Sequence, residues 1–259
     1  MMSLGVADDM ICPTEWQAKS FPHEYQSKIT IVHDGIDTNK LLPNPNSTIR
    51  LTSGLTLTTD SEVVTFLSRN LEPYRGYHIF MRALPSLLEK RPNLRVMIVG
   101  GDSVSYGSEP ETTKGVKQSW KTLFIDEVKS KIKPEDWARV HFVGKIPYDT
   151  YVNLMQISSV HIYLTYPFVL SWSLLEAMSM GAAIVASATQ PVEEYMKDGE
   201  NGLLFDFFDV ESLSELVIKL LADPKERSRL GKNARDFAIS QLDLTDQCLP
   251  KQISWVESV

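Results

Sequence analysis

Short apolar runs recur along most of the chain, and longer stretches with helical spacing separate them. The runs are rich in β-branched and aromatic residues, which favours buried strands over helices of equal length. The sequence predicts strands over residues 28–32, 63–67, 95–99, 139–143, 160–165, 183–186 and 203–205.

Between these runs, apolar residues return at the spacing of one helix face. In the stretch 78–90, for example, Ile79, Phe80, Ala83, Leu84 and Leu87 follow that spacing. The predicted helices span 15–18, 78–90, 120–131, 148–157, 172–180, 192–196, 210–222, 224–241 and 249–259. Regular alternation of strands and helices predicts an α/β fold with a doubly wound, Rossmann-like parallel sheet.

Breaks in this pattern suggest how the chain is divided. Residues 43–47, Pro-Asn-Pro-Asn-Ser, have the composition of a linker, and a small βαβ fragment precedes them. We therefore expect residues 1–40 to be the remnant of a preceding domain and residues 41–259 to form the main domain. The polar stretch 102–115, which contains Gly and Pro, is expected to be a long surface loop.

Composition and charge exclude several classes of protein. The chain has 259 residues and a formal net charge of -7, which argues against general nucleic-acid binding. Its two cysteines, Cys12 and Cys248, lie far apart in the sequence, which fits a reducing compartment better than a disulfide framework. No apolar run approaches the roughly 20 residues that a membrane-spanning helix needs.

The most informative stretch is 166–181, which joins two predicted strands. Ser171 can cap a helix and Gly181 can end it, so the stretch is the crossover of a βαβ unit. Its helix begins beyond the carboxyl end of a parallel strand, where open α/β sheets bind ligands and helix amides suit phosphate. Glu176 on this helix could accept hydrogen bonds from sugar hydroxyls. Taken alone, it could equally be a solvated helix residue.

A second constellation follows the first strand of the main domain. Arg69 and Arg75 lie in the loop between that strand and the next helix. Two guanidinium groups in such a loop can grip one diphosphate, because each can pair with phosphate oxygens in a bidentate way. The alternative is that both are solvated surface arginines.

Two other motifs give weaker signals. Gly100 and Gly101 follow a strand but lack the third glycine of a dinucleotide fingerprint, so NAD binding is poorly supported. Asp206 and Asp209 could be taken for a metal pair, but aspartate in such positions favours turns and helix caps. No cluster of Cys and His residues indicates a metal site.

Together these motifs resemble the signature of family 4 retaining glycosyltransferases, which have two Rossmann-like domains (the GT-B fold). The family motif has two glutamates in the stretch that corresponds to 166–181. The second matches Glu176, while Phe168 occupies the position of the first. Arg69 matches a family arginine, Arg75 replaces a family lysine, and Gly76 matches a glycine of the same loop.

The resemblance assigns roles to these positions. It implies that Arg69, Arg75 and Gly76, with the loop around Val169, Leu170 and Ser171, bind the diphosphate of a nucleotide diphosphate sugar. Glu176 would hold the ribose, Lys145 and Ile146 would lie near the nucleobase, and Phe168 would lie near the transferred sugar. The identity of the catalytic groups stays open.

The resemblance also implies an activity for the whole protein. The chain would be the C-terminal, donor-binding half of a hexosyl- or glycosyltransferase that retains anomeric configuration and needs no cofactor or metal. Its partners would be the sugar donor and a sugar, lipid-linked or glycan acceptor held by the N-terminal domain, so the chain alone should transfer little. A cytoplasmic location is implied, with peripheral membrane attachment of the full-length form as an option. Two other interpretations stay open: a non-catalytic nucleotide-binding or regulatory module, which Phe168 and the short N-terminal part favour, and another enzyme on the same scaffold, such as a nucleotide-sugar epimerase, for which no convincing set of carboxylate or His residues is found. The sugar, the base and the acceptor are left undetermined.

Overall fold

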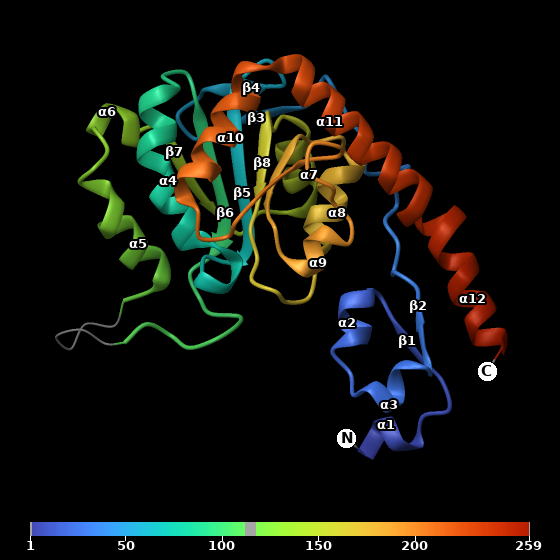
Figure 1. Cartoon of the computed structure of the whole chain (residues 1–259). Coiled ribbons are helices and arrows are strands. Elements are labelled where there is room, and N and C mark those ends of the chain that lie inside the picture. Colours follow the sequence, from blue (N-terminus) through green and yellow to red (C-terminus); the bar gives the residue numbers. More distant parts are fainter. Residues whose placement is uncertain (1, 112–117, 259) are drawn as a thin grey trace.

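The computed structural model describes residues 2–111 and 118–258 and contains a small N-terminal lobe and a large α/β domain (Figure 1). The expected loop at 102–115 is irregular as far as residue 111, and the rest of that prediction lies outside the described residues. The small lobe consists of helices α1 (Met2–Val6), α2 (Glu15–Lys19) and α3 (His23–Gln26) and strands β1 (Met10–Cys12) and β2 (Ile29–Ile31). β1 and β2 pair in parallel, so this lobe is a βαβ fragment, as expected.

The large domain is built on a six-stranded sheet in the order β10-β9-β8-β5-β6-β7. All of its strand pairs are parallel. The strands are β5 (Val63–Asn70), β6 (Arg95–Gly101), β7 (Val140–Gly144), β8 (Val160–Tyr163), β9 (Ile184–Ser187) and β10 (Leu203–Phe205). Each was predicted from its apolar run, so the doubly wound parallel sheet expected from the sequence is confirmed.

Helices cover both faces of this sheet. One face carries α4 (Tyr77–Lys90), α5 (Trp120–Lys129) and α10 (Val210–Ala222), while α7 (Tyr148–Gln156) and α8 (Trp172–Ser179) cover the other (Figure 1). Successive strand residues point to opposite faces. In β5, Val64 and Phe66 pack toward α4, whereas Val63 packs on the α7 side. A continuous apolar strand therefore fills two cores.

The remaining short helices each begin with a proline in the first turn. They are α6 (Pro134–Trp137) and α9 (Gln190–Glu193). The sequence pattern placed the second of these at 192–196. It begins earlier because Pro191 fits the first turn of a helix and Thr189 stands at its N-cap.

A small hairpin was missed by the sequence analysis. β3 (Thr48–Arg50) and β4 (Thr56–Thr58) pair antiparallel directly after the 43–47 stretch. Their inward residues Ile49 and Leu57 pack with Met97 and Val99 on the α7 side of the sheet. Each of these strands holds a single apolar residue, so neither shows the apolar run by which the strands of the large sheet were recognised.

The C-terminal segment returns to the small lobe. α11 (Pro224–Phe237) continues through two π-helical turns, Ala238–Leu242 and Leu244–Cys248, into α12 (Leu249–Ser258). In α12, Nε2 of Gln252 donates to the carbonyl of His33 over 3.0 Å, and the helix lies beside the small lobe (Figure 1). Cys12 and Cys248 are both free thiols in buried positions.

Candidate functional site

The strand order places a topological switch point between β5 and β8. From β5 the chain proceeds through β6 to β7, and from β8 it proceeds through β9 to β10 in the opposite direction. Loops that leave two such strands diverge to opposite faces, and in open α/β sheets the crevice expected between them at the carboxyl edge is where ligands bind. Arg69 lies near the end of β5 itself and not in the following loop as expected, because β5 runs on to Asn70. The loop after β5 carries Arg75 and Gly76, and the loop after β8 carries residues 164–171.

Arg75 joins these two loops. Its Nη1 donates to Oγ1 of Thr165 over 2.9 Å and to the carbonyl of Val169 over 3.3 Å. Thr165 is fully buried, whereas Val169 is exposed, so the guanidinium lies where the crevice opens to solvent. Within the described part of the chain, no carboxylate forms an ion pair with Arg75. Its positive charge is therefore available to an anionic ligand.

Gly76 allows these loops to approach closely. It has a φ of 69°, and a Cβ atom built on it would lie 2.3 Å from Cβ of Leu164 in the loop after β8. Any larger residue would push the loops apart and move Arg75. Gly76 therefore allows the backbones of the loops after β5 and β8 to pack closely at the switch point.

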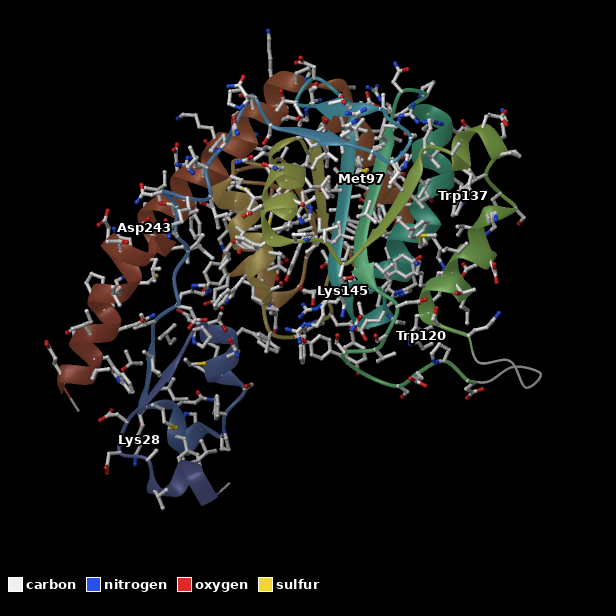
Figure 2. The ribbon with its side chains drawn as sticks, turned by 180° about the vertical axis from the view of Figure 1, so that it is seen from behind. Lys28, Met97, Trp120, Trp137, Lys145 and Asp243 are labelled. Carbon is white, nitrogen blue, oxygen red and sulfur yellow. The ribbon has the colours of Figure 1, made fainter. Side chains whose placement is uncertain are left out.

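Two further basic residues lie beside Gly101 at the end of β6, Lys145 with its side chain and Arg69 with its backbone. A Cβ atom on Gly101 would meet Cε of Lys145 at 2.7 Å and the carbonyl oxygen of Arg69 at 3.3 Å. The side chains of Arg69 and Lys145 are exposed, and Figure 2 shows Lys145 beside the carboxyl ends of the central strands. Arg69, Arg75 and Lys145 thus give this edge of the sheet a local positive charge in an acidic protein.

Glu176 is held by tyrosines from the neighbouring helix. Its Oε1 accepts a hydrogen bond from the hydroxyl of Tyr148 over 2.7 Å, and its Oε2 accepts one from Tyr151 over 2.8 Å. Burial and the nearby Glu176 carboxylate raise the pKa of both phenols, so both stay protonated as donors. Ile146 is half-buried in the turn that leads into α7, and this places the predicted base-binding turn next to the partners of Glu176.

The loop 168–171 combines core packing with exposed positions. The side chain of Leu170 is buried, and that of Val169 is exposed. Ser171 caps α8, because its Oγ accepts from the amide of Ser173, while its own amide donates to the hydroxyl of Tyr163 over 2.9 Å. The ring of Phe168 lies 5.4 Å from Cζ of Arg75. The structure therefore brings Phe168, Val169 and Arg75 together, as one edge of the crevice.

Several residues of this site escaped the sequence analysis. Thr165, Tyr106, Tyr148 and Tyr151 contact Arg75 or Glu176 in the structure. Tyr148 and Tyr151 stand three positions apart on a predicted helix, which places them on the same face and could have flagged them. Tyr106 lies in an irregular loop whose path has no sequence signal.

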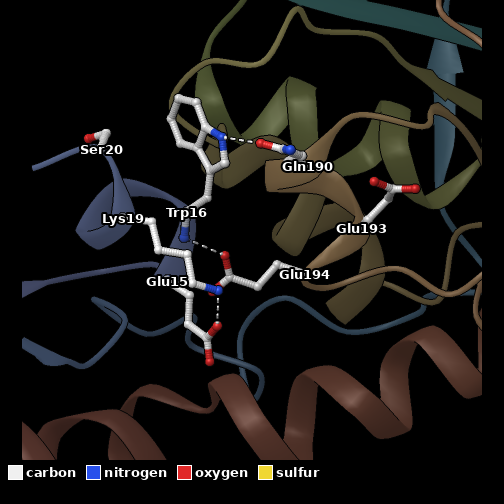
Figure 3. Close-up of a pocket in the computed structure, with 7 residues that line it drawn as sticks. All are labelled: Glu15, Trp16, Lys19, Ser20, Gln190, Glu193 and Glu194. Atoms are coloured by element: carbon white, nitrogen blue, oxygen red, sulfur yellow. Dashed lines mark hydrogen bonds and ion pairs between the residues drawn. The ribbon is translucent and has the colours of Figure 1, made fainter. Parts of the chain in front are cut away.

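The small lobe is fastened to the main domain near this edge. Glu194 accepts hydrogen bonds from the amides of Glu15 and Trp16 over 2.8 and 3.1 Å, at the start of α2. The indole of Trp16 donates to Oε1 of Gln190 over 3.1 Å. These contacts border a cavity of about 490 Å³ between α2 and α9 (Figure 3).

The residues that the structure describes contain neither a metal-binding cluster nor a membrane-spanning helix. Among them, no group of three or more His, Cys, Asp or Glu side chains is placed to hold a metal ion. Asp206 and Asp209 instead accept backbone hydrogen bonds from Phe208 and Ser212, which confirms them as turn and cap residues. In the same part of the chain, no helix is both long and apolar enough to cross a bilayer.

Similarity to known proteins agrees with this geometry. Residues 54–237 match the family described as "Glycosyl transferases group 1", and residues 1–41 match the family described as "Glycosyl transferase family 4 group". D-inositol 3-phosphate glycosyltransferase of Corynebacterium efficiens is 27% identical over 238 residues, which cover 90% of this chain and 52% of the relative. The chain thus spans about half the length of that curated relative.

Solved structures share the fold. The crystal structure of Anabaena HepE in complex with UDP and glucose superposes with a TM-score of 0.76 at 20% identity, over 99% of this chain and 65% of HepE. A second match is the C-terminal domain of a group 1 glycosyl transferase, LpcC from Francisella tularensis. The match extends over 82% of this chain and 100% of the LpcC domain, with a TM-score of 0.65 at 17% identity. The expected likeness to the C-terminal half of a GT-B fold is confirmed. The matched segment 54–237 includes both loops of the switch point and the helix of Glu176. Because this match extends over well more than half of the chain, the chain belongs to the glycosyl transferase group 1 family, within family 4 of the glycosyltransferases.

Proposed function

We propose that the site at the switch point binds a nucleotide diphosphate sugar, as the donor site of a retaining glycosyltransferase. The observation that carries this proposal is Arg75, an arginine without a carboxylate partner in the described structure that bridges the loops after β5 and β8. An anion in the crevice would complete its coordination, and a diphosphate supplies the paired oxygens that a guanidinium prefers. Arg69 and Lys145 add charge along the same edge.

The diphosphate is the group on which charge develops when the sugar leaves. Arg69 and Arg75 would stabilise that charge, together with the amides of Val169 and Leu170 and the positive end of α8. The amide of Ser171 is already bonded to Tyr163, so its share would be smaller. Gly76 would act by keeping both loops close to the phosphates.

Glu176 would bind the ribose. A carboxylate with both oxygens facing hydroxyl donors is suited to a vicinal diol, and the hydroxyls of Tyr148 and Tyr151 occupy these positions in the structure. Ribose would share or replace the more exposed Tyr148 contact, since Tyr148 is 56% exposed and Tyr151 is buried. Lys145 and Ile146, in the turn before the same helix, would border the base.

Transfer also needs an acceptor site. We propose that residues 1–40 belong to an acceptor-binding domain and residues 41–259 to the donor-binding domain, with support from the family 4 match at residues 1–41. Domain closure over the donor is expected to complete such a site. The 259-residue chain alone would therefore bind donor and transfer little sugar.

A second candidate function is a nucleotide-binding module without catalysis. Phe168 favours it, because the family has a glutamate at this position against the transferred sugar. The two functions make different predictions for the longer protein. Turnover of a nucleotide sugar by a chain that includes a complete acceptor domain would support the transferase, and tight binding without turnover would support the module.

Calorimetry tests the donor site. Purified chain is titrated with UDP, GDP and ADP and with a sugar derivative of each, beginning with UDP. We expect one base to bind and Arg75→Ala and Glu176→Ala each to raise its Kd about tenfold or more. Arg229→Ala is the matched control, since Arg229 pairs with Glu226 on the distant helix α11. Binding of none of the six compounds by the wild-type chain would refute the donor site.

A further inference from the structure

Arg75 is bordered by two aromatic rings as well as by hydrogen-bond acceptors. Its Cζ lies 5.2 Å from the ring centre of Tyr106 and 5.4 Å from that of Phe168. The two rings lie 4.6 Å apart, tilted by 59°. A guanidinium at such distances is attracted by the ring faces, and this attraction leaves its net charge unchanged.

Tyr106 owes its position to a buried carboxylate. Oε2 of Glu72 accepts hydrogen bonds from the amides of Ser105 and Tyr106 over 2.9 and 3.0 Å, and the side chain of Glu72 is fully buried. Nδ2 of Asn70 donates to Oγ of Ser105 over 2.7 Å. Asn70 at the end of β5 and Glu72 in the loop that follows therefore both hold the loop that carries Tyr106.

Phe168 is held from the opposite side. The amide of Tyr166 donates to the carbonyl of Tyr74 over 3.0 Å, and the rings of these residues meet edge to face at 5.4 Å. This joins the loop after β8 to the turn just before Arg75. The rings of Tyr106 and Phe168 and the guanidinium of Arg75 thus come from three loops, after β6, β8 and β5, which are fixed to one another.

We propose that Tyr106 and Phe168 form an aromatic clamp that orients Arg75 toward the diphosphate and gives the transferred sugar an apolar wall without a carboxylate. The proposal rests on the proposed function and specifies the sugar end of the same site. The bonds to Thr165 and Val169 use Nη1 of Arg75, and the guanidinium also faces the hydroxyl of Tyr163, so it keeps N–H groups for phosphate oxygens.

The clamp has a consequence for substrate choice. In this proposal Arg75 grips the phosphate that carries the sugar, so the sugar would meet the rings that border this arginine. The ring of Phe168, which stands where the family has a glutamate, attracts the C–H face of a sugar but accepts no strong hydrogen bond from its hydroxyls. We therefore expect the site to accept hexoses that lack a hydroxyl, such as 6-deoxyhexoses, about as well as their hydroxylated counterparts.

A carboxylate in place of Phe168 should be harmful. It would stand within reach of Arg75, pair with the guanidinium and cancel the charge that attracts the diphosphate. Restoring the glutamate of the family pattern would thus weaken the nucleotide site of this particular chain. A purely structural role of Phe168 in packing predicts instead that leucine and glutamate disturb binding to the same extent.

The experiment is calorimetry of wild type, Phe168→Glu, Phe168→Leu, Phe168→Tyr and Tyr106→Leu with the preferred nucleoside diphosphate and two of its sugars, one a 6-deoxyhexose. We expect Phe168→Glu to raise the Kd of the nucleoside diphosphate about tenfold, and Phe168→Leu and Tyr106→Leu about threefold. Phe168→Tyr should restore affinity to within about twofold. Phe21→Leu, which removes a half-buried aromatic ring of the small lobe, is the control.

The outcomes separate the two proposals. If the wild type binds no nucleotide, the donor site itself is refuted and the clamp with it. If the wild type binds but Phe168→Glu binds the nucleoside diphosphate as tightly, the clamp alone is refuted. A 6-deoxyhexose donor that binds more than about tenfold more weakly than its hydroxylated counterpart would also refute it, because the wall would then contain a hydroxyl-reading group. Urea midpoints of all variants identify any that fail to fold. If Phe168→Glu does not fold, Phe168→Tyr still tests the clamp, because a Kd more than about twofold above that of the wild type would contradict the role of the ring.

Discussion

The hydroxyl of Tyr151 donates a hydrogen bond to Oε2 of Glu176 over 2.8 Å, from one helix of the sheet's second face to the next. Tyr151 is buried, and its phenol pKa is raised by burial and by the carboxylate. The contact fixes the rotamer of Glu176 before any ligand arrives. A carboxylate that is already oriented loses less conformational freedom when it binds a diol.

Tyr151→Phe should therefore weaken nucleotide binding without any direct contact to the ligand. A hydrogen bond to a charged group contributes about 1.5–3 kcal/mol, so we expect a roughly tenfold rise in the Kd of the preferred nucleotide. Calorimetry measures it, with Tyr25→Phe in the small lobe as the control. An unchanged Kd would mean that Glu176 is oriented without Tyr151 or does not touch the ligand.

Arg75→Lys should retain part of the function of Arg75. Lysine keeps the charge but cannot bond Thr165 and Val169 while it also faces a diphosphate in a bidentate way. We expect a Kd between those of the wild type and Arg75→Ala for the nucleoside diphosphate, and no change for the nucleoside alone. Equal losses for both ligands would show that the substitution disturbed the whole site and not a phosphate contact.

Much of the fold was predictable because its signals are local. The six strands of the large sheet are apolar runs bounded by polar turns, and caps such as Ser171 mark where helices begin. The hairpin of β3 and β4 was not predictable, since its stability comes from Ile49 and Leu57 packing against Met97. Short strands without tertiary support carry almost no signal.

The candidate site divides in the same way. Arg75 and Glu176 could be proposed from motif spacing, because each follows a strand at the sheet's carboxyl edge. Their partners could not, since Tyr106, Thr165 and Tyr151 reach them only through the order of strands and the path of loops. The sequence also indicated Phe168 as a departure from the family but could not show that it lies against Arg75.

Glu194→Gln should loosen the small lobe. The Glu194 carboxylate accepts hydrogen bonds from the amides of Glu15 and Trp16 (Figure 3). Hydrogen bonds to a charged acceptor are stronger than those to the neutral amide of glutamine. We expect these two amides to exchange hydrogen roughly tenfold faster in the variant, as measured by NMR. Glu193→Gln is the matched control, because no hydrogen bond joins the Glu193 side chain to these amides. Equal exchange in both variants would mean that other contacts hold the lobe.

Gly231→Ala should destabilise the chain although it improves a helix. Alanine gains about 1 kcal/mol over glycine within a helix. At this position, however, a Cβ atom would lie 2.1 Å from the carbonyl oxygen of Gly181, so α11 would have to move away from the end of α8. Such overpacking costs about 1–3 kcal/mol, and we expect a net loss in urea unfolding. Gly199→Ala is the comparison variant, because its added Cβ meets no atom within 4 Å although its φ is +71°. Its loss of stability reports backbone strain alone, whereas that of Gly231→Ala reports the steric clash. A stabilised Gly231→Ala protein would show that the two helices pack less closely than described.

His161 should make stability depend on pH. Complete burial in β8 lowers its pKa from 6.5 to about 4, and its Nδ1 lies 2.9 Å from Oγ1 of Thr65. Between these values the unfolded chain binds a proton that the folded chain does not, so stability rises with pH over this range and is lost as pH falls through it. For this residue the loss between pH 7.5 and pH 5 amounts to about 2 kcal/mol in the free energy of unfolding. His78, whose pKa burial also lowers to about 4, should add a loss of the same sign.

His161→Gln lacks the titrating group, so urea unfolding of this variant at the two pH values should show a smaller difference than the wild type. An equal difference in both proteins would assign the pH dependence to other groups.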